Sequence, residues 1–166
     1  MGVGLVSLAL MSTEILLTRL FSVVLWYHFA FFAISVALLG LSAAAIVVHA
    51  CEDRISPERA HAHLALGCLL VAASVLVLAA ALVHVTPDWF GTGASAFFTT
   101  ITPRLFLLFF AAAAPFFLGG LVVSFALVRC GDAIHRLYAW DLAGAGLACL
   151  SVIPLLDKLG GPGSLV

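Results

Sequence analysis

The stretch from Glu14 to Ala45, EILLTRLFSVVLWYHFAFFAISVALLGLSAAA, joins two long apolar runs through a short aromatic segment. Two charged residues, Glu14 and Arg19, lie inside the first run. A charge near the centre of a bilayer costs about 2.5 to 3.5 kcal/mol on insertion scales, so such residues usually face a protein interior, a partner or a water-filled cavity. The stretch therefore predicts two consecutive membrane helices that share a buried polar site or a polar contact.

The whole chain has the composition of a polytopic membrane protein. Of its 166 residues, 64% are hydrophobic and 9% are charged, whereas charged residues make up about 25% of soluble globular domains. The formal net charge is −1, so the composition indicates the lipid bilayer as a partner and no basic surface for nucleic acid. The four cysteines form no C-x-x-C pair, and neither a disulfide framework nor a zinc site is predicted.

Five apolar segments approach or exceed the roughly 20 residues that cross about 30 Å of hydrocarbon. They cover residues 3–24, 29–48, 64–83, 105–128 and 137–156. They are too long for strands and show no alternation, and a helix satisfies every backbone group within lipid. The sequence predicts one membrane domain, an all-α bundle of five full spans.

The basic residues between the spans predict the orientation, because positive loops face the cytoplasm. Four arginines fall in the two loops on the side of the N-terminus and two basic residues on the other side: Arg54, Arg59, Arg129 and Arg136 against Arg104 and Lys158. We expect a multi-pass protein of the inner (plasma) membrane with a cytoplasmic N-terminus.

The first span is close to break-even for insertion. Its twelve Leu, Ile, Val and Phe residues contribute roughly −4 to −7 kcal/mol, against about +5 to +7 for Glu14 and Arg19 together. Five residues apart, the two charged side chains point about 140° from each other on an ideal helix, so each needs a partner of its own. Thr18 is on the same face as Glu14 and is expected to donate a hydrogen bond to it.

The last span carries Asp141 about one turn inside its cytoplasmic end, followed by a run of small residues that includes Gly144 and Gly146. Gly40 and Ala44 form a similar small-x-x-x-small pair on the second span, and such faces permit close helix contact. The breaker Leu159-Gly160-Gly161-Pro162-Gly163 predicts that the last helix ends before it.

Three classes of function compete. No nucleotide-binding, metalloprotease or nucleophile-elbow motif occurs, so no enzyme active site is predicted. Glu14, Arg19 and Asp141 either pair in a dry, structural packing contact or line a polar cavity for a cation or proton. Histidines near both ends of the spans leave a bis-histidine haem protein as a third alternative: His28 and His84 on one side, His49, His61 and His63 on the other.

The chain resembles a known bacterial family at three places: the segment beginning Glu14-Ile-Leu-Leu-Thr-Arg, the run ALLGLSAAA, and Tyr138-Ala-Trp-Asp-Leu-Ala-Gly-Ala-Gly with the later Leu155-Leu-Asp-Lys-Leu-Gly-Gly-Pro-Gly. These motifs are similar to the membrane part of fused membrane/spermidine-synthase-like proteins. In that family a bundle like that of the major facilitator transporters precedes a soluble domain resembling aminopropyltransferases.

The resemblance implies the first half of a major-facilitator-like domain, cut before the synthase-like domain, whose catalytic residues would follow Val166. A separate or downstream spermidine-synthase-like domain and a homo-oligomer are the implied partners. The implied role is a membrane anchor for that enzyme, or a module that binds or transports a small cation such as a polyamine. Its candidate polar site comprises Glu14, Thr18, Arg19, Tyr138 and Asp141.

Overall fold

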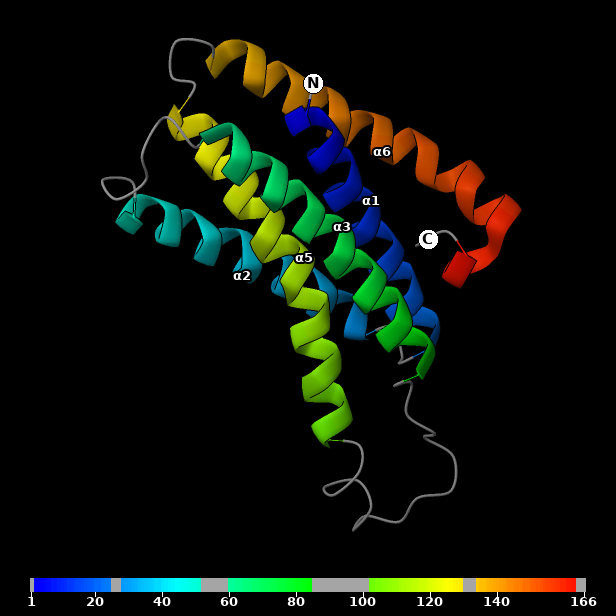
Figure 1. Cartoon of the computed structure of the whole chain (residues 1–166). Helices are drawn as coiled ribbons and strands as arrows, with labels where there is room; N and C mark the ends of the chain where they lie inside the picture. The colour runs from blue at the N-terminus through cyan, green and yellow to red at the C-terminus, as the bar shows by residue number, and fades with distance from the viewer. Residues whose placement is uncertain (1, 25–27, 52–59, 85–101, 130–133, 164–166) are drawn as a thin grey trace.

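The computed structural model of the protein describes residues 2–24, 28–51, 60–84, 102–129 and 134–163. These residues form five α-helices and no strand: α1 (Gly2–Val24), α2 (His28–Cys51), α3 (Ala60–His84), α5 (Thr102–Arg129) and α6 (Ile134–Gly163) (Figure 1). Each helix contains a segment of at least 21 residues that is long and apolar enough to cross a membrane. The predicted all-α bundle of five spans is confirmed.

The observed helices equal or exceed the expected ranges, and the largest difference is at the end of α6. That helix continues to Gly163, so the predicted break before Leu159 was wrong. Pro162 is next to the last residue of the helix, so its missing N–H removes only one hydrogen bond, and no further turn follows that it would interrupt. Figure 1 shows the last turns of α6, in red, bending away from the direction of the rest of the helix.

α1 and α5 connect the bundle, because each contacts several other helices. α5 packs along α2 and α3 and touches α1, while α1 packs along α6 and α2. Figure 1 shows α6 at the margin of the bundle beside α1, which is its main neighbour. The largest side chains at the centre are nearly inaccessible, among them Leu17, Phe21, Leu78 and Phe116.

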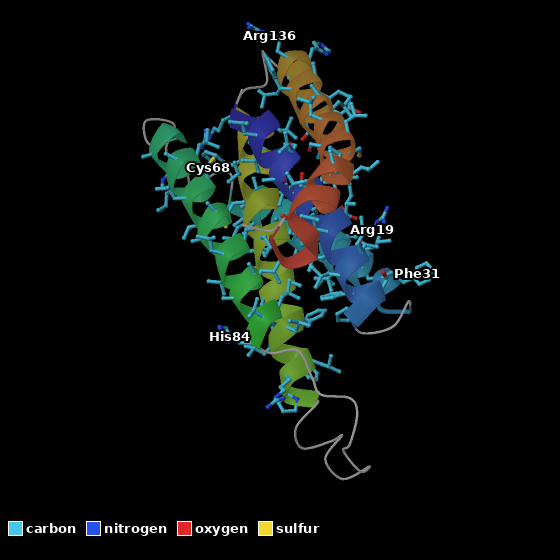
Figure 2. All side chains as sticks on the ribbon, turned by 90° about the vertical axis from the view of Figure 1, so that its right-hand side faces the viewer. Arg19, Phe31, Cys68, His84 and Arg136 are labelled. Atoms are coloured by element: carbon cyan, nitrogen blue, oxygen red, sulfur yellow. The ribbon has the colours of Figure 1, made fainter. Side chains whose placement is uncertain are left out.

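The outer surface of the bundle is rich in large apolar side chains. Leu150, Phe31 and Leu69 are 75%, 70% and 69% exposed, and Figure 2 shows Phe31 projecting away from the helices. Soluble monomers rarely expose contiguous apolar patches of more than a few hundred Å², whereas lipid tails are as apolar as leucine. The bundle is therefore built for a membrane.

Small residues permit a close crossing of α2 and α5. A Cβ added to Gly40 would lie 2.9 Å from the Phe116 Cβ and 3.0 Å from the Phe117 backbone nitrogen. One turn further along α2, the buried Ala44 faces Gly120, where an added Cβ would lie 2.8 Å from the Ala44 Cβ. The predicted small-x-x-x-small pair of α2 thus lies in this contact.

A second close crossing joins α1 and α6. An added Cβ at Gly144 would lie 2.0 Å from the Gly4 carbonyl oxygen, and one at Gly4 would lie 2.7 Å from the Trp140 carbonyl oxygen. Gly146 was expected to lie in a helix contact, and it does not. It is exposed, and within the described part of the chain an added Cβ there would meet no atom within 4 Å, because two residues along a helix turn a position about 200° away from the contact.

We expect Gly40→Val to destabilise the bundle by about 1 to 3 kcal/mol, the usual effect of overpacking. The added methyl groups would meet the α5 backbone, which cannot rotate aside. Unfolding of the purified protein by sodium dodecyl sulfate in mixed micelles would measure the loss. Leu39→Val, at an exposed position on the same helix, is the control, and equal midpoints for the two variants would contradict the close crossing.

Candidate functional site

A partly open cavity of about 270 Å³ lies between α1, α2, α5 and α6. Two carboxyl and two hydroxyl side chains line it: Glu14, Asp141, Ser7 and Ser124. The remaining lining is apolar or glycine, and consists of Leu10, Met11, Leu41, Phe116, Gly120, Val123 and Ala145. The cavity therefore holds two acidic groups within apolar walls, and we call it the acidic cavity.

Asp141 is held at one end of the acidic cavity by a hydrogen bond from α1. The Ser7 hydroxyl donates to Asp141 Oδ1 and also lies 3.0 Å from the Val3 carbonyl oxygen. Ser7 follows Gly4 by three residues, and Asp141 precedes Gly144 by three, so both side chains lie one turn from the glycine crossing. The close approach of the two backbones is what lets the short serine side chain reach the carboxylate.

Glu14 lies two turns beyond Ser7 on the same face of α1, about 10 Å further along the helix axis. Thr18 lies one turn further, but its hydroxyl donates to the Glu14 backbone carbonyl at 2.7 Å and not to the carboxylate. Such back-bonding to the preceding turn is common for threonine in helices. Within the described part of the chain, the Glu14 carboxylate forms no hydrogen bond or ion pair.

A second cavity, of about 360 Å³, continues along α1 toward the end that leads to α2. We call it the α1–α2 groove. Glu14 and Met11 border both this groove and the acidic cavity. The other lining residues of the groove are Ile15, Thr18, Arg19, Ser22, Ala30 and Ile34.

The structure divides the residues that the sequence singled out. It brings Glu14 and Asp141 to one cavity, and it places Arg19 in the α1–α2 groove with its side chain exposed (Figure 2). Tyr138 is 58% exposed and lines neither space. Glu14, Thr18 and Arg19 all border the α1–α2 groove, but Arg19 does not reach the acidic cavity, as the angular separation of the two charged side chains on an ideal helix explains.

Two lining residues, Ser7 and Ser124, were missed by the sequence reading. Ser7 precedes Glu14 by seven residues, two turns of one helix face, and this spacing is a signal that sequence reasoning can use. Ser124 has no such signal, because serine is common in membrane helices and its partners come from other helices. Only the packing of α5 against α1 and α2 places it at the cavity.

The histidines with described side chains form no metal centre. His49, His63 and His84 are exposed, and among the described residues no three His, Cys, Asp or Glu side chains come together where they could hold a metal ion. His63 instead lies edge-on to Phe125, with 6.4 Å between ring centroids. The side chains of His28 and His61 lie outside the described residues, so the bis-histidine haem alternative stays a prediction.

No protein-family model matches the chain, and no curated protein or solved structure matches it either. Its class therefore rests on the fold and the site alone. In its described part the protein is an α-helical bundle with five membrane-span-like helices and a partly open cavity lined by two carboxyl groups.

Proposed function

We propose that the protein is a membrane module that binds a small organic cation in the acidic cavity. The observation that carries the proposal is the presence of Glu14 and Asp141, from helices at opposite ends of the chain, in the lining of one cavity. An intramembrane carboxylate is costly and tends to be kept for an ion or proton path. A bound cation would neutralise the two groups where the described chain supplies no basic partner for Glu14.

The cavity also has the chemistry that an aliphatic ammonium ion requires. Carboxylate oxygens accept charge-assisted hydrogen bonds from N⁺–H groups, and the apolar walls between Asp141 and Glu14 suit methylene groups. The spacing of about 10 Å between Ser7 and Glu14 along α1 favours an elongated cation with a positive group near each carboxylate. A polyamine has these properties.

The motif resemblance supports the same ligand class. We propose that the chain is the membrane part of a fused membrane/spermidine-synthase-like protein, related to half of a major facilitator domain, and serves a polyamine-synthesising partner. Its N-terminus is proposed to be cytoplasmic in the plasma membrane. The end of the bundle that holds Arg136, opposite His84 in Figure 2, would then face the cytoplasm.

Spermidine binding to the purified protein in nanodiscs, followed by isothermal titration calorimetry, tests the proposal. We expect Glu14→Gln and Asp141→Asn each to weaken binding roughly 10- to 100-fold, since the lost charge–charge interaction is worth about 1.4 to 3 kcal/mol and 1.4 kcal/mol corresponds to tenfold. Both substitutions keep the size of the side chain and leave it able to hydrogen bond.

Ser35→Ala is the control, because Ser35 is exposed on α2 and does not line the acidic cavity. It is expected to bind spermidine like the unaltered protein. Equal binding by all four proteins, or binding by none, would rule out a cation site at Glu14 and Asp141.

A structural membrane module is the second candidate, and the Ser7–Asp141 hydrogen bond beside the Gly4–Gly144 crossing favours it. In that case Asp141 serves the contact between α1 and α6, as an anchor or assembly element. Ser7→Ala would then lower the stability of the bundle, and no cation would protect it against unfolding. A cation site predicts instead that spermidine raises the unfolding midpoint.

A further inference from the structure

Polar residues continue along the face of α1 that carries Ser7 and Glu14. Thr18 follows Glu14 by four residues and Ser22 follows Thr18 by four, so with Met11 these residues occupy one side of the helix. From Ser7 to Ser22 this polar stripe spans about 22 Å at 1.5 Å per residue. It therefore covers most of the roughly 30 Å of a bilayer's hydrocarbon core.

The two cavities of the structure adjoin along this stripe. The acidic cavity reaches from Ser7 to Glu14, and the α1–α2 groove reaches from Met11 to Ser22. Since Met11 and Glu14 line both, the two spaces meet at these side chains. Together they border α1 from the level of Asp141 to the end where the chain passes into α2.

The hydroxyl groups of the groove present acceptor oxygens. Thr18 donates its only hydroxyl proton to the Glu14 carbonyl, and Ser22 donates its own to the Arg19 carbonyl, each at 2.7 Å. A hydroxyl group has one donor and two acceptor lone pairs. The Thr18 and Ser22 oxygens can therefore still accept hydrogen bonds from a bound molecule. Water, with its two protons, and cations match such a surface.

We propose that the α1–α2 groove and the acidic cavity form one water-filled path along α1, open to water at the groove beside Thr18, Arg19 and Ser22. The path gives a cation access from that side to Glu14 and then to Asp141, so it deepens the proposed cation site and rests on it for its ligand. Arg19, exposed in the groove about five residues from the end of α1, places a positive charge at the mouth and slows the access of cations.

Cysteine labelling in nanodiscs tests the path. The background is the full chain with its four cysteines replaced by alanine, and the test variants are Thr18→Cys and Met11→Cys. A membrane-impermeant methanethiosulfonate reagent reacts quickly only with a thiol in contact with water. We expect both test variants to react at least tenfold faster than a thiol that faces lipid at similar depth.

Leu38→Cys is the matched lipid-facing control. Leu38 is 59% exposed and lies ten residues from the start of α2, at a depth between those of Thr18 and Met11, which lie six and thirteen residues from the end of α1. All variants are compared at equal helical content and as monodisperse particles, so misfolded material does not enter the rates. Labelling of Thr18→Cys and Met11→Cys no faster than Leu38→Cys overturns the path and indicates that lipid, or a second copy of the chain, covers the groove.

Spermidine separates this inference from the proposed function. At a saturating concentration it is expected to slow the labelling of Met11→Cys, which borders the acidic cavity. Fast labelling without protection would leave the path standing and remove the cation site. Spermidine binding without fast labelling would leave the cation site standing and remove the path.

The charge of Arg19 is tested with cationic and anionic reagents of equal size. At a distance of about 8 Å in water, one charge changes the local concentration of a univalent reagent roughly twofold in either direction. Arg19→Gln is therefore expected to raise the ratio of cationic to anionic labelling rates at Thr18→Cys by about fourfold. An unchanged ratio would exclude Arg19 from the mouth of the path.

Discussion

Gly144→Ala is expected to separate α6 from α1 and to lower the free energy of unfolding by about 1 to 3 kcal/mol. The new Cβ would lie 2.0 Å from the Gly4 carbonyl oxygen and 2.8 Å from its carbonyl carbon. Both are backbone atoms, so no side-chain rotation relieves the overlap and the helices must move apart. Among the described helices only α1 makes an extensive contact with α6, and little resists that movement.

The same substitution is expected to disturb the position of Asp141 in the acidic cavity. Asp141 precedes Gly144 by one turn, and its hydrogen bond from Ser7 depends on the close approach of the two backbones. We therefore expect Gly144→Ala to weaken spermidine binding along with stability, although it alters no polar side chain. Detergent unfolding followed by circular dichroism measures the first effect, and calorimetry measures the second.

Gly146→Ala is the control for this prediction. It adds the same methyl group two residues away, where no described atom lies within 4 Å of the added Cβ. Because alanine has a higher helix propensity than glycine by about 1 kcal/mol, it is expected to leave stability unchanged or slightly raised. If Gly144→Ala and Gly146→Ala behave alike, α1 and α6 do not cross at the glycines.

Glu14→Leu is expected to turn α1 from a marginal span into an efficient one. Exchanging a carboxylate near the middle of the helix for leucine improves insertion by about 3 kcal/mol, which is more than 100-fold in an equilibrium constant. A glycosylation reporter on an isolated α1 segment measures the inserted fraction. The same substitution in the full chain is expected to abolish spermidine binding, so insertion improves as the proposed function is lost.

Arg19→Leu provides the comparison on the same helix. Arg19 is exposed and lies about five residues from the end of α1, so its long side chain reaches toward the membrane interface and its charge costs less. We expect a clearly smaller gain in insertion than for Glu14→Leu. A gain as large as that of Glu14→Leu would show that Arg19 also lies in the hydrocarbon.

The prediction of five spans succeeded because the requirement is local. A segment of about 20 apolar residues in lipid must satisfy its own backbone groups, and a helix does so without any partner. The same local character explains the error at the end of α6. Glycine and proline near Leu159 lower helix propensity, but propensity alone does not end a helix when the breaking residue stands at its last turn.

The site was only partly accessible to sequence reasoning. Glu14 and Asp141 stood out because charges are rare in apolar spans, and their positions on their own helices follow from the helical repeat. Their common cavity did not follow, since it depends on which faces of α1, α2, α5 and α6 meet. Gly144 and Gly146 looked equivalent in sequence, yet only Gly144 faces α1.

The sequence by itself determined that this protein is an all-helical membrane bundle with acidic residues in its first and last helices, because hydrophobic length and helical periodicity are properties of single segments. The tertiary structure alone decided that Ser7 meets Asp141, that Glu14 joins them in one cavity, and that Arg19 lies outside this cavity in the groove that Glu14 also borders. The physical reason is that contacts between helices in lipid depend on close packing at a few small residues. The residue that each of them contacts belongs to another helix, far away in the sequence.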